Sequence, residues 1–173
     1  MRQQRDASQH LKRAFSVVPD RLRNAAPMAG KEEIVDITTY IGSVYPWHCD
    51  HMGHMNIMWY VSKFDEANWN LFGVLGLSPS YMRSESRGMA AVQQNITYRQ
   101  EALPGDLVEV RSRVIEITDK SIRFVHEMRN RETSAVLATC ELIGVHLDRA
   151  NRKAVSLPCD VKERAEAVFS GHQ

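Results

Sequence analysis

The sequence of 173 residues contains few cysteines and no long apolar run. Its three cysteines, Cys49, Cys140 and Cys159, are odd in number, far apart and without a C-x-x-C pair. This usage argues against a disulfide framework and favours a reducing compartment. No run approaches the roughly 18 apolar residues of a membrane-spanning helix, and no apolar block typical of a signal peptide opens the chain. We therefore expect a cytoplasmic protein without a membrane partner.

An excess of one charge is also missing, because 22 Lys and Arg oppose 21 Asp and Glu, for a net charge of +1. The balance is uneven along the chain. Residues 1–31 hold seven basic and two acidic residues, which leaves 15 basic and 19 acidic residues in 32–173. A mildly acidic body binds a phosphate backbone poorly, so no nucleic-acid partner is expected. We interpret residues 1–31 as a basic N-terminal extension and residues 32–173 as one domain.

The most unusual stretch is the nine-residue segment from His48 to Asn56, His-Cys-Asp-His-Met-Gly-His-Met-Asn. It holds a carboxylate, three histidines, a turn glycine and a helix-capping asparagine between two apolar segments. Such a polar segment disfavours folding unless the protein uses it. A chemical site is therefore expected here.

Apolar residues after this segment recur on one face of a helix of about five turns. They are Tyr60, Phe64, Ala67, Leu71 and Leu75. Other patterns predict a strand at residues 34–47, a loop at 78–87 and strands at 88–100, 107–118, 121–131 and 135–148, with a last helix at 161–169. Short links make the later strands antiparallel neighbours, and the long helix must cover one face of the sheet. The predicted class is α+β.

The run Asp50-His51-Met52-Gly53-His54-Met55-Asn56, with Tyr60 four residues later, resembles the signature of the 4-hydroxybenzoyl-CoA thioesterase-like acyl-CoA thioesterases. Pro104-Gly105-Asp106 and Val145-His146-Leu147-Asp148 extend the similarity over about residues 33–168. The resemblance implies a hotdog fold, a five-stranded antiparallel sheet wrapped around a long central helix. It also implies hydrolysis of an acyl-CoA substrate to a free acid and CoA.

The resemblance further implies a role for each residue of the segment. Asp50 is the general base or the nucleophile, and amide N–H groups around Asn56 and Ile57 stabilise the oxyanion. Gly53 supplies a positive φ, and His54 holds the turn or contacts the acyl group. From the residues alone, Asp50 also suits an Asx-turn and Asn56 an N-cap. Tyr60 matches a family position, but we expect it to pack in the core.

The family joins two protomers edge to edge, which implies a homodimer, or a homotetramer of two dimers. One helix covers one face of the sheet and an exposed strand edge invites pairing, so this assembly is also expected on physical grounds. In the family, strands after the helix face the partner's turn. We therefore expect the segment Met89–Tyr98 to complete the neighbour's site.

Two alternatives remain open. His48 replaces an aspartate found in many family members, which favours a non-catalytic acyl-CoA-binding module. Ile57 and Met58 replace an asparagine or a small residue, so we expect a substrate pocket that differs from the common short-chain or aromatic types. His48, His51 and His54 step by three and suit zinc or iron. A turn at Gly53 argues against such a metal site, so no metal and no cofactor are expected.

The acyl group is not fixed by the sequence. Tryptophan and methionine near the segment indicate an apolar pocket, or one that tolerates a cation, so carnitine- or betaine-type esters are conceivable. These residues are Trp47, Trp59, Met55 and Met58. Arginines that could bind the CoA phosphates are Arg99, Arg111, Arg113 and Arg123.

Overall fold

The computed structural model describes residues 36–170, so the expected extension at residues 1–31 lies outside the described part. In chain order the elements are β1 (Ile37–Ser43), the 3-10 helix η3 (Pro46–His48), α2 (Ile57–Val74), α3 (Pro79–Ser84), β2 (Arg87–Tyr98), β3 (Leu107–Ile117), β4 (Ser121–Asn130), β5 (Val136–Asp148), β6 (Lys153–Ala154) and α4 (Cys159–Ser170). The sheet order is β1-β3-β4-β5-β2, with β6 paired to β5, and every pairing is antiparallel.

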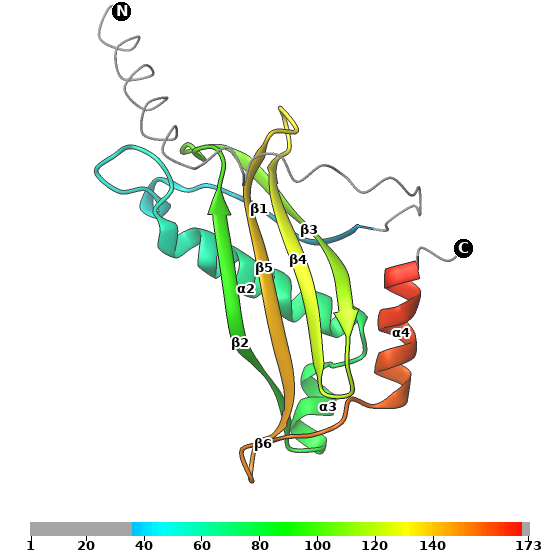
Figure 1. Ribbon diagram of the computed structural model, residues 1–173. Helices are drawn as coiled ribbons and strands as arrows, with labels where there is room; N and C mark the ends of the chain where they lie inside the picture. Colours follow the sequence, from blue (N-terminus) through cyan, green and yellow to red (C-terminus); the bar gives the residue numbers. More distant parts are fainter. Residues whose placement is uncertain (1–35, 171–173) are drawn as a thin grey trace, which may run out of the picture. The chain divides into compact units, whose positions relative to one another are not determined.

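The sheet curls around α2, which crosses behind the long strands in Figure 1. Alternate side chains of β4 are fully buried, including Ile122, Phe124 and Met128. The predicted apolar face of α2 meets this layer, and each of its five members is at most 3% exposed. Apolar residues at every second position of the strands and at every third or fourth position of the helix therefore meet in one core. The expected α+β hotdog fold is confirmed.

Three details differ from the sequence predictions. The predicted strand at 34–47 is wrong at its end, because Pro46 begins η3 and removes a ladder donor. The predicted loop at 78–87 contains α3, whose first turn is capped by Ser78 Oγ accepting from the Tyr81 N–H at 3.2 Å. The sheet also gains the two-residue strand β6, which was not predicted.

A chain of buried polar groups ties α2 to the sheet. On the sheet side, the hydroxyls of Thr39 and Ser112 are 2.5 Å apart, and Ser112 Oγ is 2.5 Å from His126 Nδ1. On the helix side, His126 Nε2 donates to Asn68 Oδ1 at 2.7 Å. All four residues are at most 7% exposed. Because these bonds depend on register, they fix the position of α2 along the sheet.

The strand β2 lies at an edge of the sheet and pairs only with β5 among the described elements. Its middle, residues 91–95, is exposed, and Val92 is 62% exposed. Within residues 36–170, no helix is both long and apolar enough to cross a membrane.

Candidate active site

The polar segment folds into a closed loop directly before α2. Cys49 and Met55 form an isolated antiparallel bridge at its base. Inside it, the Gly53 N–H donates to the Asp50 carbonyl at 3.0 Å, and the Asp50 N–H donates to the His54 carbonyl at 3.2 Å. Gly53 has a φ of 84°, as predicted, and apart from its chain neighbours no atom lies within 4 Å of where a Cβ would stand. The loop thus needs glycine for its backbone conformation and not for space.

The carboxylate of Asp50 is held at the start of α2 by two donors. The Met52 N–H donates to Asp50 Oδ1 at 2.9 Å, and the Asn56 side-chain amide donates to Asp50 Oδ2 at 2.8 Å. Asn56 Oδ1 in turn accepts from the Met58 N–H at 3.0 Å, which confirms Asn56 as the N-cap. One asparagine therefore caps the helix and orients the carboxylate.

These contacts also set the charge of Asp50. The N–H of Met52 and then the amide of Asn56 hold the pKa of the carboxyl below its usual range, and the nearby His54 and His51 lower it further. The partly exposed side chain is therefore ionised at neutral pH. A carboxylate in this state can attack a carbonyl carbon or accept a proton from water.

The first turn of α2 offers one amide donor that is free within residues 36–170. The expectation of a free N–H at Asn56 is wrong, because it donates to the His48 carbonyl at 2.9 Å. The N–H of Met58 is used by the cap and that of Trp59 by the Asn56 carbonyl at 3.0 Å. The N–H of Ile57 has no acceptor in the described part of the chain and lies at the positive end of the helix dipole.

The three histidines of the segment do not converge. His48 is 7% exposed, accepts from the Tyr45 N–H at 3.1 Å through Nδ1, and packs on Trp59 with ring centroids 4.2 Å apart. Burial lowers the pKa of His48. His54 Nε2 is 3.5 Å from Glu101, whereas His51 is exposed. In the described part of the chain, no three His, Cys, Asp or Glu side chains gather as a metal site.

Tyr60 lies in the core, as predicted. Its hydroxyl accepts from the Ala102 N–H at 3.1 Å and donates to the Gln100 carbonyl at 3.4 Å. Burial is the main reason that its pKa rises to about 12. The residue thus joins α2 to the segment after β2, and within residues 36–170 its hydroxyl makes no hydrogen bond to Asp50.

Apolar side chains around the loop face solvent in the single chain. Trp47 is 66% exposed and stacks on Tyr45 at 4.4 Å, so one face of its ring is already covered. Ile57 and Met58 at the helix start are 63% and 60% exposed. An exposed apolar rim next to a polar loop is typical of a site that another surface completes.

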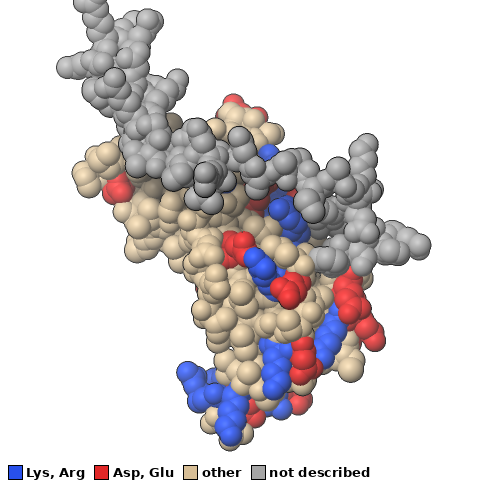
Figure 2. Space-filling view, in the orientation of Figure 1, with Lys and Arg blue, Asp and Glu red and all other residues tan. Residues whose placement is uncertain are grey.

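Most of the arginines expected for CoA phosphates are already paired on the outer sheet face. Arg111 binds Glu109 at 2.8 Å, Arg113 lies 3.5 Å from Asp36, and Arg123 binds Glu141. Figure 2 shows such blue and red side chains side by side across this face. Their charges are therefore matched within the chain, which makes this face a weak anion site.

Comparison with known proteins places this loop and fold in context. Residues 44–165 match the family model described as the Thioesterase-like superfamily. The L-carnitine dehydrogenase/betainyl-CoA thioesterase of Rhizobium meliloti is 24% identical over 123 residues, which cover 71% of this chain and 25% of that protein. The chain thus spans about a quarter of that relative. The long-chain acyl-CoA thioesterase FadM of Escherichia coli is 26% identical over 126 residues, covering 70% of this chain and 92% of FadM.

Among solved structures, a Staphylococcus aureus protein determined in complex with CoA superposes with a TM-score of 0.74 at 15% identity, covering 86% of this chain and 90% of that one. At this identity the likeness supports the fold alone. The family match covers more than half of the chain and includes the Asp50 loop, α2 and the whole sheet apart from β1. The chain therefore belongs to the Thioesterase-like superfamily.

Proposed function

We propose that the protein is an acyl-CoA thioesterase that hydrolyses an acyl-CoA to a free acid and CoA. The observation that carries this proposal is the ionised carboxylate of Asp50, held by Asn56 directly before Ile57, whose N–H has no acceptor within residues 36–170. Thioester hydrolysis needs these two groups: one that attacks or activates water, and a donor where the oxyanion develops. The family match and the acyl-CoA thioesterases among the relatives support the same chemistry.

Two mechanisms use this geometry. In the first, Asp50 takes a proton from water as the water oxygen bonds to the thioester carbon. In the second, an Asp50 oxygen bonds to that carbon and forms an anhydride, which water then hydrolyses. In both, the carbonyl oxygen gains charge opposite the Ile57 N–H, the C–S bond breaks, and the CoA thiolate leaves and takes up a proton. The lowered pKa keeps the Asp50 carboxylate ionised, which both routes require.

The proposed functional unit is a homodimer, with a tetramer of two dimers as the larger form. The exposed edge of β2 supports it, since unpaired backbone groups there can bond to a second copy. Val92 on this edge and Met58 and Val61 on α2 are 62%, 60% and 40% exposed, and pairing would bury them. Size-exclusion chromatography with light scattering tests this, and a stable, fully active monomer would exclude it.

The test of activity is a panel of acyl-CoA esters assayed by thiol release. It includes short, long-chain, aromatic and betainyl esters, because the relatives are named for long-chain and betainyl substrates. Asp50→Asn should lower kcat/KM by roughly 10²–10⁴-fold, the usual scale for a lost acid–base group. Glu132→Gln, an exposed carboxyl in the β4–β5 link, is the matched control and should retain activity. Full activity of Asp50→Asn would refute the proposal.

The second candidate is a non-catalytic acyl-CoA-binding module. It is favoured by His48, which is buried against Trp59 at a position where many family members carry a second carboxylate. Calorimetry distinguishes the two candidates. Tight binding of CoA esters without turnover across the whole panel would establish the module.

A further inference from the structure

A hollow lies at the opposite end of β2 from the Asp50 loop. The loop lies near the Tyr98 end, since the Met55 N–H donates to the Ala102 carbonyl at 2.8 Å and the rings of Tyr60 and Tyr98 are 5.2 Å apart. The hollow lies at the Arg87 end and has a volume of about 420 Å³. At about 3.3 Å per residue, the 12 residues of β2 separate these two ends by roughly 35 Å.

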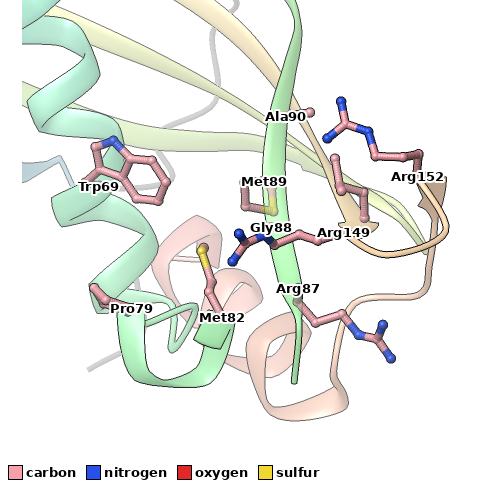
Figure 3. Close-up of a pocket in the computed structure, with 10 residues that line it drawn as sticks. Trp69, Pro79, Met82, Arg87, Gly88, Met89, Ala90, Arg149 and Arg152 are labelled. Carbon is pink, nitrogen blue, oxygen red and sulfur yellow. The ribbon is translucent and has the colours of Figure 1, made fainter. Parts of the chain in front are cut away.

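The hollow combines an apolar wall with a basic rim. Trp69 on α2 and Met82 on α3 lie across from Met89 on β2 (Figure 3). The rim carries Arg149 and Arg152 from the turn between β5 and β6. Lys and Arg side chains gather at this end of the molecule in Figure 2, where Figure 1 places β6. This lining suits an anionic group carried on an apolar or planar body.

The two rim arginines differ from the third arginine of the hollow. Arg87 donates to Asp148 at 2.7 Å, so its charge is matched. Arg149 and Arg152 form no ion pair with any carboxylate in residues 36–170. Two unmatched guanidinium groups at the mouth of one hollow attract an anion, and each offers two parallel donors to a carboxylate or a phosphate.

The backbone presents these arginines to the hollow. Gly88 leaves the surface of β2 open, and the Arg149 methylenes pack there, 3.4 Å from where a Cβ would stand. Its guanidinium crosses β2 towards Met82 in Figure 3. The turn is fixed by Asp148, whose Oδ1 accepts from the Ala150 and Asn151 N–H groups at 2.9 Å each. The backbone that carries the two arginines is therefore fixed before a ligand binds, which reduces the ordering needed on binding.

Pairing of two β2 edges would bring the hollow to the other protomer's site. Antiparallel strands joined at their exposed middles place the Arg87 end of one beside the Tyr98 end of the other. The hollow is remote from the Asp50 loop of its own chain, and in the proposed β2-to-β2 pairing it would lie next to the Asp50 loop of the second copy.

We propose that the hollow binds the anionic end of the substrate whose thioester lies at the Asp50 loop of the second protomer, with Arg149 and Arg152 as its ligands and Trp69 as its apolar wall. This inference rests on the proposed thioesterase function. Two parts of a substrate carry the required chemistry: the phosphates of the CoA nucleotide, and an acid group at the far end of the acyl chain.

The first experiment uses the double variant Arg149→Gln/Arg152→Gln to decide which part of the substrate, the CoA phosphates or an acyl acid group, occupies the hollow. The control, Arg129→Gln, removes an arginine that already binds Glu127 on the outer face. If the nucleotide occupies the hollow, the Kd of CoA by calorimetry rises roughly 10- to 100-fold in the double variant and not in the control. If an acyl acid group occupies it, the CoA Kd is unchanged. The KM for an ω-carboxyacyl-CoA then rises by that factor, while the KM for the unsubstituted ester of equal length does not. If the Kd of CoA and both KM values stay as in wild type, the proposal is overturned.

The second experiment tests whether the hollow acts across the dimer. Chains carrying Asp50→Asn and chains carrying the double arginine change are given different tags, refolded together, and purified as the mixed dimer. In the proposed arrangement one site of that dimer combines an intact Asp50 with an intact hollow, so KM is that of wild type and kcat is about half. If each hollow serves its own chain, KM stays at the value of the double variant, and the shared site is refuted.

These results remain distinct from a failure of the proposed function. A wild-type protein without turnover on any ester refutes the thioesterase proposal, while the CoA titration still decides whether the two arginines bind the nucleotide. Arg149→Lys/Arg152→Lys retains the charges and should recover part of the lost affinity, whereas a purely structural role predicts no such recovery.

Discussion

Acidification should destabilise this fold through His126, the imidazole at the centre of the polar chain in the core. The ring is fully buried, and burial lowers its pKa from 6.5 to about 3. Asn68 on α2 and Ser112 on β3 bond to it, and both are uncharged. Opposite it on β5 lies Cys140, whose thiol is neutral because burial raises its pKa. Within residues 36–170 no carboxylate bonds to the ring, so an imidazolium there has no anionic partner.

The direction and size of the effect follow from linkage. In the unfolded chain the imidazole takes up a proton near pH 6.5, whereas in the folded chain it does so only near pH 3. The unfolded state therefore binds more protons as pH falls through this window, and the free energy of unfolding decreases. Between pH 7 and pH 5 this single group should remove roughly 2 kcal/mol, at about 1.4 kcal/mol per pH unit below 6.5.

Urea unfolding at pH 7 and pH 5, at equal protein concentration, measures the loss. In His126→Gln the loss between the two pH values should be smaller than in wild type by about 2 kcal/mol, even though the variant is less stable at both. His51→Gln removes an exposed imidazole and serves as the control. An equal loss in wild type and His126→Gln would refute the reasoning. If His126→Gln does not fold, the His126 ring proton resonance in wild type decides, because it should not shift between pH 7 and pH 5.

Three further changes test the loop and its support. Asn56→Ala removes the helix cap and should lower the free energy of unfolding, measured in urea, by about 1 kcal/mol. It also removes the bond that lowers the pKa of Asp50, so the acid limb of the kcat/KM pH profile should move to higher pH. Gly53→Ala should lower the free energy of unfolding by roughly 1–2 kcal/mol, because alanine disfavours positive φ even with open space around it. Tyr60→Phe leaves the Ala102 N–H without its acceptor and should lower the melting temperature, equivalent to roughly 1–3 kcal/mol.

The helix face was readable from the sequence because spacing alone determines which side chains share a face. Tyr60, Phe64, Ala67 and Leu71 recur at three to four residues, and all are buried. The six-residue α3 was missed because it is too short for a periodic signal, although Ser78-Pro79 is a typical N-cap and first-turn pair. A periodic pattern therefore predicts a helix well, whereas the lack of such a pattern does not exclude a short one.

The site was only partly readable, for a different reason. Asp50 and Gly53 each have a strong local preference that the loop uses, so their conformations were predictable. The engagement of the Asn56 N–H by His48 depends on how the loop closes, which no residue pattern encodes. The basic hollow brings together Trp69, Met89 and Arg152 from α2, β2 and the turn after β5, so its parts are separated by up to 83 positions in the sequence.

The core and the candidate site are linked through the rigidity of α2. Its buried face and the contact of Asn68 with His126 fix the helix along the sheet. Lys63 fixes it laterally, because its ammonium donates to the Tyr40 hydroxyl at 2.9 Å and to the Ser43 carbonyl at 3.3 Å. These contacts hold the start of α2, and with it the Ile57 N–H and the Asn56 cap that orients Asp50, in one position relative to the sheet. A donor held in place before the reaction stabilises the developing oxyanion without reorganisation, which is the condition for efficient electrostatic catalysis.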